Sequence, residues 1–321
     1  MNEEKNMSEI TLVTAYFNIG REKWDGFSRG DEQYISYFKH WARLKNNLIV
    51  YTTSEIADKV NQIREQFGLL EKTHVVCIDD VFSVKPELYQ AIKHVMKNKE
   101  SWLFHKWLDH PESWNYRYNY VTGLKAFWCY DAVERKLADG MVAWIDFGYD
   151  HGGMDFPYSE DFAFQWEYDF SENIHIFLAK KLDEKPIFGI VRDMDTYIRG
   201  GIIVAPAQMW TLIWKEFRRA IQSLADCGLA DDDQTLLLMT YRKYPKLFCS
   251  HMTSYWGEPL REYGGSSLRR RTPKQKRFNT FHVLNRRFRN YRKEQLKLWS
   301  MKLDIRRRKG EKIEKEYFLE K

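Results

Sequence analysis

The chain has 321 residues, 44% of them hydrophobic and 30% charged, so it can bury a sizeable core and is not disordered throughout. It contains no apolar stretch of roughly 18 residues or more, and its polar start, MNEEKNMSEI, does not have the apolar centre of a secretory signal. Its four cysteines form no C-x-x-C pair, which excludes a zinc knuckle or a dense disulfide framework. We therefore expect reduced thiols in a cytoplasmic protein.

The net charge of +6 conceals two regions of opposite charge. Ser266–Lys321 carries 20 Lys and Arg against 6 Asp and Glu, so Met1–Gly265 has a net charge of −8. This division predicts an acidic globular domain over residues 1–265 and a basic, amphipathic helical extension over residues 266–321.

Strands and helices alternate along residues 1–265. Short apolar runs predict strands at Ile10–Phe17, Leu48–Tyr51, Val75–Ile78, Met141–Phe147, Gly201–Ala205 and Leu247–Ser250. Helical spacing and start signals predict helices at Gln33–Leu44, Ser54–Phe67, Pro86–Met96, Tyr116–Leu137, Gln208–Leu224 and Asp231–Tyr241. This alternation favours an α/β fold with a mostly parallel sheet, in which ligands bind at the carboxyl ends of the strands.

The segment VAWIDFGYDHGG is the most informative strand end. An apolar strand delivers Asp146, and Gly148, Asp150 and His151 follow. A carboxylate at the end of a buried strand is costly unless it is paired or binds a cation, and Asp with His suits Mn²⁺ or Mg²⁺. The alternative is a simple polar turn, in which Asp and Gly act only as turn formers.

The exit of the first strand suits a nucleotide. We expect Thr14, Tyr16, Phe17 and Arg21 to contribute, with an aromatic ring stacking on a base and Arg21 pairing with a phosphate. There is no G-x-G-x-x-G and no P-loop, which argues against a dinucleotide enzyme or a P-loop ATPase. A plain surface loop is the competing interpretation.

Three later segments carry further candidates. Gly200 and Gly201 open an apolar strand, where backbone can approach a sugar or phosphate. The run ADDDQTL opens a helix, and its carboxylates either cap that helix or face a pocket as a base. His251 follows a short apolar run, and a lone histidine in that position is more often structural than a ligand.

Together the motifs T-A-Y-F-N-I-G-R, W-I-D-F-G-Y-D-H and D-D-Q-T-L resemble the bacterial HtrL/YibB-like family of surface-polysaccharide loci, over most of Ile10–Pro259. Their order also resembles that of GT-A glycosyltransferases. This resemblance implies a GT-A-like, mixed and mostly parallel sheet flanked by helices. It also implies a nucleotide-sugar donor, such as a UDP-hexose, and a divalent metal.

The resemblance further assigns roles to residues. Asp146 matches the first carboxylate of a D-x-D metal motif, and Gly148 stands where the second would be, so that Asp150 or His151 would serve instead. His251 matches a late histidine ligand. The resemblance places Lys125, Gly200 and Gly201 beside the donor, and it places Asp232, Asp233 and Gln234 in the acceptor and catalytic loop.

The basic extension has aromatic residues at steps of three and four, with arginines opposite. This pattern predicts a helix lying on an anionic membrane surface. The competing interpretation is that the aromatic stripe packs on the domain formed by residues 1–265. Nucleic-acid binding is disfavoured by the acidic body.

We therefore predict a glycosyltransferase that moves a hexose to a lipopolysaccharide or other surface-glycan acceptor, such as an O-antigen, at the inner face of the cytoplasmic membrane. A metal-dependent phosphoesterase is the first alternative. The second is a non-catalytic protein that binds a glycan or membrane and has a degenerate glycosyltransferase fold.

Overall fold

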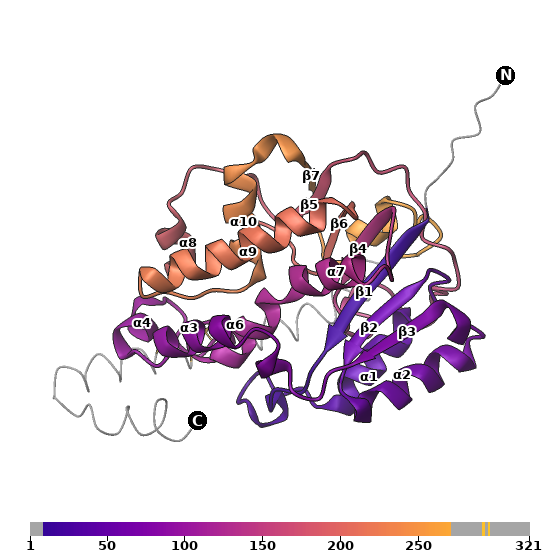
Figure 1. The fold of residues 1–321 in the computed structure, drawn as a ribbon, viewed down its shortest axis with the longest axis horizontal. Coiled ribbons are helices and arrows are strands. Elements are labelled where there is room, and N and C mark those ends of the chain that lie inside the picture. The colour runs from indigo at the N-terminus through magenta and orange to yellow at the C-terminus, as the bar shows by residue number, and fades with distance from the viewer. Residues whose placement is uncertain (1–8, 271–290, 293–294, 296–321) are drawn as a thin grey trace.

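A seven-stranded sheet forms the centre of the molecule in the computed structural model, which describes residues 9–270, 291, 292 and 295 (Figure 1). Its strands lie in the order β3-β2-β1-β4-β6-β5-β7. All neighbours are parallel except β6, which runs antiparallel to both β4 and β5. The strands are β1 Ile10–Tyr16, β2 Leu48–Thr52, β3 Thr73–Cys77, β4 Met141–Ile145, β5 Ile174–Leu178, β6 Ile202–Pro206 and β7 Phe248–Met252.

Helices flank the sheet, with α1 and α2 beside the β2–β3 end and α9 and α10 toward the β5–β7 end (Figure 1). The helices are α1 Asp31–Trp41, α2 Ser54–Gln66, α3 Pro86–Met96, α4 Lys99–Phe104, α5 Pro111–Trp114, α6 Tyr116–Gly123, α7 Lys125–Glu134, α8 Ile187–Asp193, α9 Met209–Asp226, α10 Asp233–Lys243 and α11 Glu258–Glu262.

The two faces of the sheet each bury a separate apolar core. Successive side chains of a strand point to opposite faces, so Val13 belongs to one core cluster and Leu12 to the other. Trp144 and Ile145 divide in the same way on β4. Burial on both faces explains why these strands are apolar runs without polar alternation.

The α/β class and the mixed, mostly parallel sheet are confirmed. All six predicted strands and all six predicted helical regions are present, but Tyr116–Leu137 is divided at Leu124 into α6 and α7. Strand β5 and the helices α4, α5, α8 and α11 had no prediction. Because His175 interrupts the apolar run of β5, that segment does not read as a buried strand.

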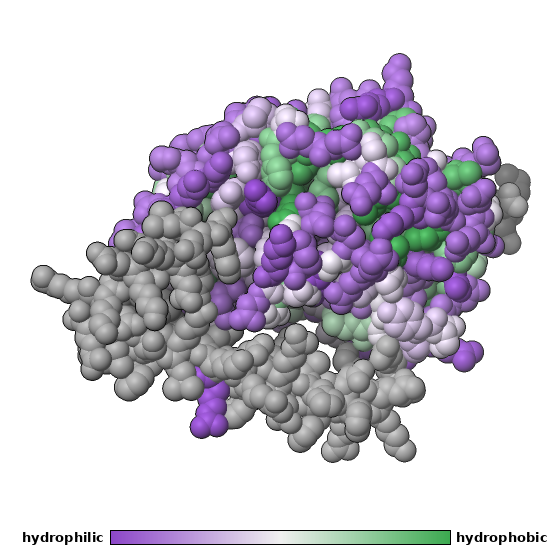
Figure 2. Space-filling model, turned by 90° about the horizontal axis from the view of Figure 1, so that it is seen from below, coloured by the Kyte–Doolittle hydropathy of each residue, from purple (hydrophilic) through white to green (hydrophobic). Residues whose placement is uncertain are grey.

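The predicted basic extension lies almost wholly outside the described residues, so the boundary at 265 and the membrane-facing helix stay predictions. Within the described part, no helix combines the length and apolar character needed to cross a bilayer. On the face shown in Figure 2, hydrophilic residues predominate and hydrophobic ones appear between them in separate small areas.

Candidate active site

A pocket of about 560 Å³ opens where β1 and β4 end, and residues that follow both strands line it. The chain order reverses at this point, because β2 and β3 lie on one side of β1 and β4 lies on the other. Loops that leave neighbouring strands toward opposite faces leave a crevice between them, and α/β sheets bind ligands there. The position of the pocket therefore follows from the topology.

Residues that precede β6 also line the pocket, because β6 runs antiparallel to β4. Because β6 runs against β4, the residues that precede β6 lie beside the residues that follow β4. The Asp146 amide donates a hydrogen bond to the Gly201 carbonyl over 2.9 Å, which extends the ladder beyond Ile145 and Ile202. Asp146, Gly200 and Gly201 consequently line the same pocket.

Lys125, the first residue of α7, joins the walls of the pocket. Its Nζ lies 2.9 Å from Asp146 Oδ1 and 3.0 Å from Asp233 Oδ2, and it donates to the Gly200 carbonyl over 3.1 Å. Burial lowers the pKa of Lys125, but the charges of Asp146 and Asp233 outweigh burial and raise it. All three N–H groups of a charged ammonium are therefore used within the protein.

Gly200 is needed for this arrangement. A Cβ built at Gly200 would lie 1.9 Å from Asp233 Oδ2, far inside van der Waals contact. Only a residue without a side chain lets Asp233 approach the strand closely enough to share Lys125.

Glu112 and the three aspartates at the start of α10 form a cluster of four carboxyl groups, of which Asp233 contacts Lys125. Asp232 caps α10 by accepting a hydrogen bond from the Gln234 amide, and Asp231 accepts from Thr235 Oγ1 over 2.7 Å. Burial raises the pKa of Asp231 to about 6, of Asp232 to about 7 and of Asp233 to about 8. Burial, and then the charges of Asp232 and Asp231, raise the pKa of Glu112 well above its ordinary value. In the hydrogen bond between Glu112 and Asp232, Glu112 is therefore the carboxyl group that is favoured to hold the proton.

Another part of the pocket lining is aromatic and basic. Arg21 donates to the Phe27 carbonyl over 3.1 Å and to Tyr34 Oη over 2.8 Å, which holds its guanidinium at the pocket wall. The Tyr16 hydroxyl donates to Asp31 over 2.5 Å, and burial raises the pKa of Tyr16. Arg29 also lines this side.

Most of the predicted site residues come together in this pocket. The residues that line it are Tyr16, Phe17, Arg21, Lys125, Asp146, Gly148, Asp150, His151, Gly200, Gly201, Asp232, Asp233 and Gln234. Thr14 does not reach the pocket, because its side chain is fully buried within β1, so its predicted role in binding is not supported. Lys125 is a positioning residue, since its donors are already occupied.

The predicted metal centre of Asp146, Asp150, His151 and His251 is not assembled. Asp150 accepts from the backbone amides of Asp155 and Phe156, over 2.6 and 3.3 Å, which engages both of its oxygens. Burial raises the pKa of Asp150 to about 7.

The two histidines of that set are also engaged elsewhere. His151 Nε2 lies 3.1 Å from Arg29, and burial together with this arginine lowers the pKa of His151 to about 4. His251 lies on β7 and does not line the pocket. Among the described residues, the only histidine, cysteine and carboxylate side chains close enough for one metal are His175, Cys249 and His251.

Sequence reasoning missed several residues that shape the pocket, notably Glu112, Arg29 and Tyr34. Glu112 stands alone among the aromatic residues of HPESWNYRYN, and no motif or spacing marks it. A solitary acid flanked by aromatic residues is the one signal that could have drawn attention to it, because such a setting desolvates a carboxyl group.

The fold and pocket define an α/β protein with a ligand site at the point where the strand order reverses. The chain belongs to the HtrL_YibB family: the family model, described as "Bacterial protein of unknown function", matches residues 8–263. It is 30% identical over 256 residues to Protein HtrL of Escherichia coli (strain K12), which covers 75% of this chain and 87% of that protein. The resemblance inferred from the motifs is thus confirmed at the level of the family.

Two solved structures are similar to this chain at low identity. The crystal structure of mouse Xyloside xylosyltransferase 1, apo form, has 12% identity and a TM-score of 0.40, over 76% of this chain and 85% of that one. PaToxG Glycosyltransferase has 8% identity and a TM-score of 0.36, over 74% of this chain and 70% of that one. Both similarities are too distant to bear on the activity of this chain.

Replacing Gly200 with alanine tests the close approach of Asp233. We expect Gly200→Ala to lower the melting temperature by several degrees, since strain of this kind costs on the order of 1–3 kcal/mol. Gly30→Ala is the matched control, because a Cβ there meets only Glu22 Cβ at an ordinary 3.7 Å. Differential scanning calorimetry measures both variants, and equal melting temperatures would contradict the packing described.

Replacing Glu112 with glutamine tests the shared proton. An unfolded glutamate ionises near pH 4.5, whereas burial raises the pKa of Glu112 in the folded protein, so the wild-type protein loses stability as the pH rises above about 4.5. Glutamine keeps the donor and removes this loss. We expect Glu112→Gln to raise the melting temperature by roughly 2–4 °C at pH 8 and by less at pH 5.

The control for this variant is Glu65→Gln, a change at an exposed residue of α2. It should leave the melting temperature unchanged at both pH values. A destabilised Glu112→Gln protein at pH 8 would show that Glu112 is ionised.

Proposed function

We propose that the protein is a glycosyltransferase that moves a hexose from a nucleotide sugar to a hydroxyl of a surface-glycan acceptor such as lipopolysaccharide. The proposed donor is a UDP-sugar. The observation that carries this proposal is the pairing, in one pocket at the strand-order reversal, of an arginine-lined side with a proton-sharing carboxyl cluster. Transfer from a nucleotide sugar needs both, since a diphosphate departs as a hydroxyl loses its proton.

The arginine side suits the nucleotide diphosphate. Arg21 uses its Nε and one NH1 donor within the protein, so donors of its guanidinium remain for phosphate oxygens. Arg29 stands on the same side of the pocket. Fixed guanidinium groups offset the negative charge that develops on the departing diphosphate, and they need no rearrangement to do so.

The β4 end suits the sugar. Asp146 Oδ1 is held by Lys125 and by the Trp144 indole N–H at 2.8 Å, which fixes the carboxylate in position. Its Oδ2 has no hydrogen-bond partner among the described residues and is available to a sugar hydroxyl. Gly201 beside it also lines the pocket.

The carboxyl cluster suits the acceptor. Asp232 would take the proton of the attacking hydroxyl as the new bond to the anomeric carbon forms, while the bond to the diphosphate breaks and its electron pair leaves with the phosphate oxygen. Gln234 Oε1 is buried and has no hydrogen-bond partner among residues 9–270, and buried polar atoms rarely stay so, which makes it suited to receive an acceptor hydroxyl.

The described residues do not fit a complete divalent-metal site. Asp146 offers one oxygen, while Asp150 and His151 are engaged elsewhere. A single carboxylate oxygen can hold Mn²⁺ or Mg²⁺ only together with the substrate's phosphates, so no step of this proposal depends on a metal.

Docking at an anionic membrane, which would bring a lipid-linked acceptor to the pocket, is part of the proposal. It rests on the charge of +14 over Ser266–Lys321, where each basic residue near such a surface contributes on the order of 1 kcal/mol.

Nucleotide binding is the first test. We expect isothermal titration calorimetry to show UDP binding that Arg21→Gln weakens at least tenfold, because a phosphate contact is lost. Arg218→Gln, on the exposed surface of α9, should bind UDP as the wild type does. Titrations with and without Mn²⁺ show whether UDP binding depends on a metal ion. Absence of binding to any nucleoside diphosphate would refute the proposal.

Transfer itself is the second test. We expect Asp146→Asn to lower the transfer rate at least 100-fold in a donor screen on lipopolysaccharide acceptors, with the melting temperature nearly unchanged. Asp139→Asn is the matched control, since this exposed carboxylate precedes the same strand at its other end. Wild-type transfer by Asp146→Asn would remove Asp146 from the mechanism, and phosphate release without an acceptor would indicate a phosphoesterase.

A further inference from the structure

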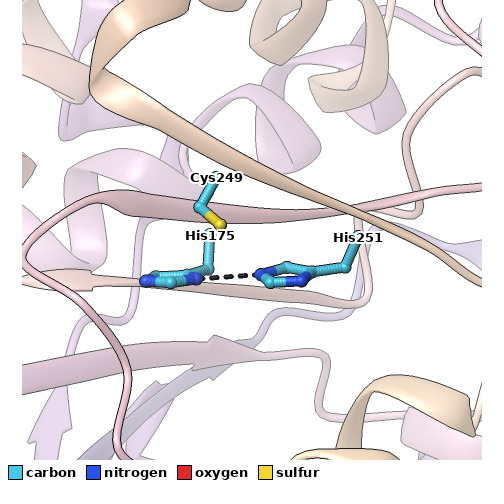
Figure 3. Close-up of side chains that lie close together, drawn as sticks. All are labelled: His175, Cys249 and His251. Atoms are coloured by element: carbon cyan, nitrogen blue, oxygen red, sulfur yellow. Dashed lines mark hydrogen bonds between the residues drawn. The ribbon is translucent and has the colours of Figure 1, made fainter.

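A second cluster of chemically active side chains lies on β5 and β7, and none of its members lines the active-site pocket. It consists of His175, Cys249 and His251, whose ligand atoms all lie within 4.8 Å of one another (Figure 3). The sheet register produces it: His175 pairs with Cys249 across the parallel strands, and His251 lies two residues along β7 from Cys249. Side chains two apart on a strand share a face, so all three project to the same side.

The two imidazoles point at each other. His175 Nδ1 lies 2.9 Å from His251 Nε2, and the two rings are inclined by only 9° (Figure 3). The other nitrogen of His175 lies 3.0 Å from the Ser171 carbonyl, which can only accept a hydrogen bond. His175 Nε2 therefore carries the proton, and the bare lone pair of Nδ1 faces His251.

This arrangement resembles the surroundings of a metal-binding histidine. A ligating imidazole usually donates its far N–H to a carbonyl or carboxylate, which fixes the tautomer and the ring orientation. Ser171 supplies that carbonyl. With Nδ1 of His175 unprotonated, a shift of the His251 proton from Nε2 to Nδ1 presents two imidazole lone pairs toward the same point.

Aromatic rings hold the cluster in place. Tyr263 lies 4.6 Å from the His251 ring and Phe170 lies 4.7 Å from the His175 ring, measured between ring centroids. Such packing reduces the side-chain freedom that metal binding would otherwise remove. Cys249 and His251 are only half-buried, and β7 is the last strand in the sheet order, so an ion can reach the cluster from that edge.

We propose that His175, Cys249 and His251 form a binding site for Zn²⁺, with a water molecule or another exogenous ligand completing a tetrahedron. Two nitrogens and a sulfur are the donors that a borderline-soft ion prefers, and Mg²⁺ or Mn²⁺ would prefer oxygen. The site is structural: it ties the edge strand β7 to β5.

The proposed zinc site affects the active-site pocket through the residues that follow β7. β7 leads directly to Trp256, which lines the active-site pocket and lies 5.1 Å from the Arg199 guanidinium. An ion that pins β7 therefore stabilises one wall of that pocket without entering it. This role does not depend on the proposed glycosyl transfer.

Metal titration of the full-length, metal-free protein tests the proposal. We expect one Zn²⁺ to bind with an affinity that Cys249→Ser and His251→Gln each lower about 100-fold or more. Co²⁺ in its place should give the visible absorption of a tetrahedral ion and a thiolate charge-transfer band, which Cys249→Ser removes. Zn²⁺ should also raise the melting temperature of the wild type and not that of either variant.

Cys77→Ser and Cys227→Ser are the controls, because both cysteines are exposed and far from the cluster in the sequence. They should bind Zn²⁺ and Co²⁺ as the wild type does. Circular dichroism of each metal-free variant establishes that it is folded. Absence of Zn²⁺ binding, or binding that survives either Cys249→Ser or His251→Gln, would overturn the proposal.

Discussion

The ammonium group of Lys125 is the interaction on which the active-site pocket depends. It connects the end of β4, the residues before β6 and the start of α10 through Asp146, the Gly200 carbonyl and Asp233. Without that positive charge, two carboxylates would face each other in a desolvated site, which is strongly unfavourable. Removing either carboxylate alone would leave the other paired. The lysine thus sets the geometry, and the absence of a side chain at Gly200 permits it.

The carboxyl cluster is a source of instability that the fold tolerates. Of its four acids only Asp233 is paired with Lys125, and burial together with mutual repulsion raises the pKa of Glu112 and of Asp232, so that the cluster favours keeping a proton. Groups held near their titration point can give and take protons at neutral pH, which a purely structural ion pair cannot do. Stability lost here is offset by the apolar cores on both faces of the sheet.

The sequence predicted the features that depend on local residue patterns, and it missed those that depend on contacts between segments distant in the chain. Apolar runs located β1, β2 and β4, and the strand-end rule placed Asp146 and Arg21 in one pocket. The direction of β6 had no local signal, since GIIVA reads the same whichever way the strand pairs. For the same reason Glu112 was missed: its importance arises from Asp232, which lies far along the chain and comes near only after folding.

His251 shows how sequence alone can assign a residue to the wrong set of neighbours. The resemblance to GT-A glycosyltransferases implied that His251 is a ligand that completes the Asp146 site. However, side-chain alternation on β7 directs His251 to the same face as Cys249, and the parallel register then brings in His175 from β5. Strand β5 was not predicted, and without it Cys249 and His251 have no third partner. Because β5 was not predicted, the sequence suggested one metal centre, whereas the structure has a pocket lined by Asp146 and a separate cluster on β5 and β7.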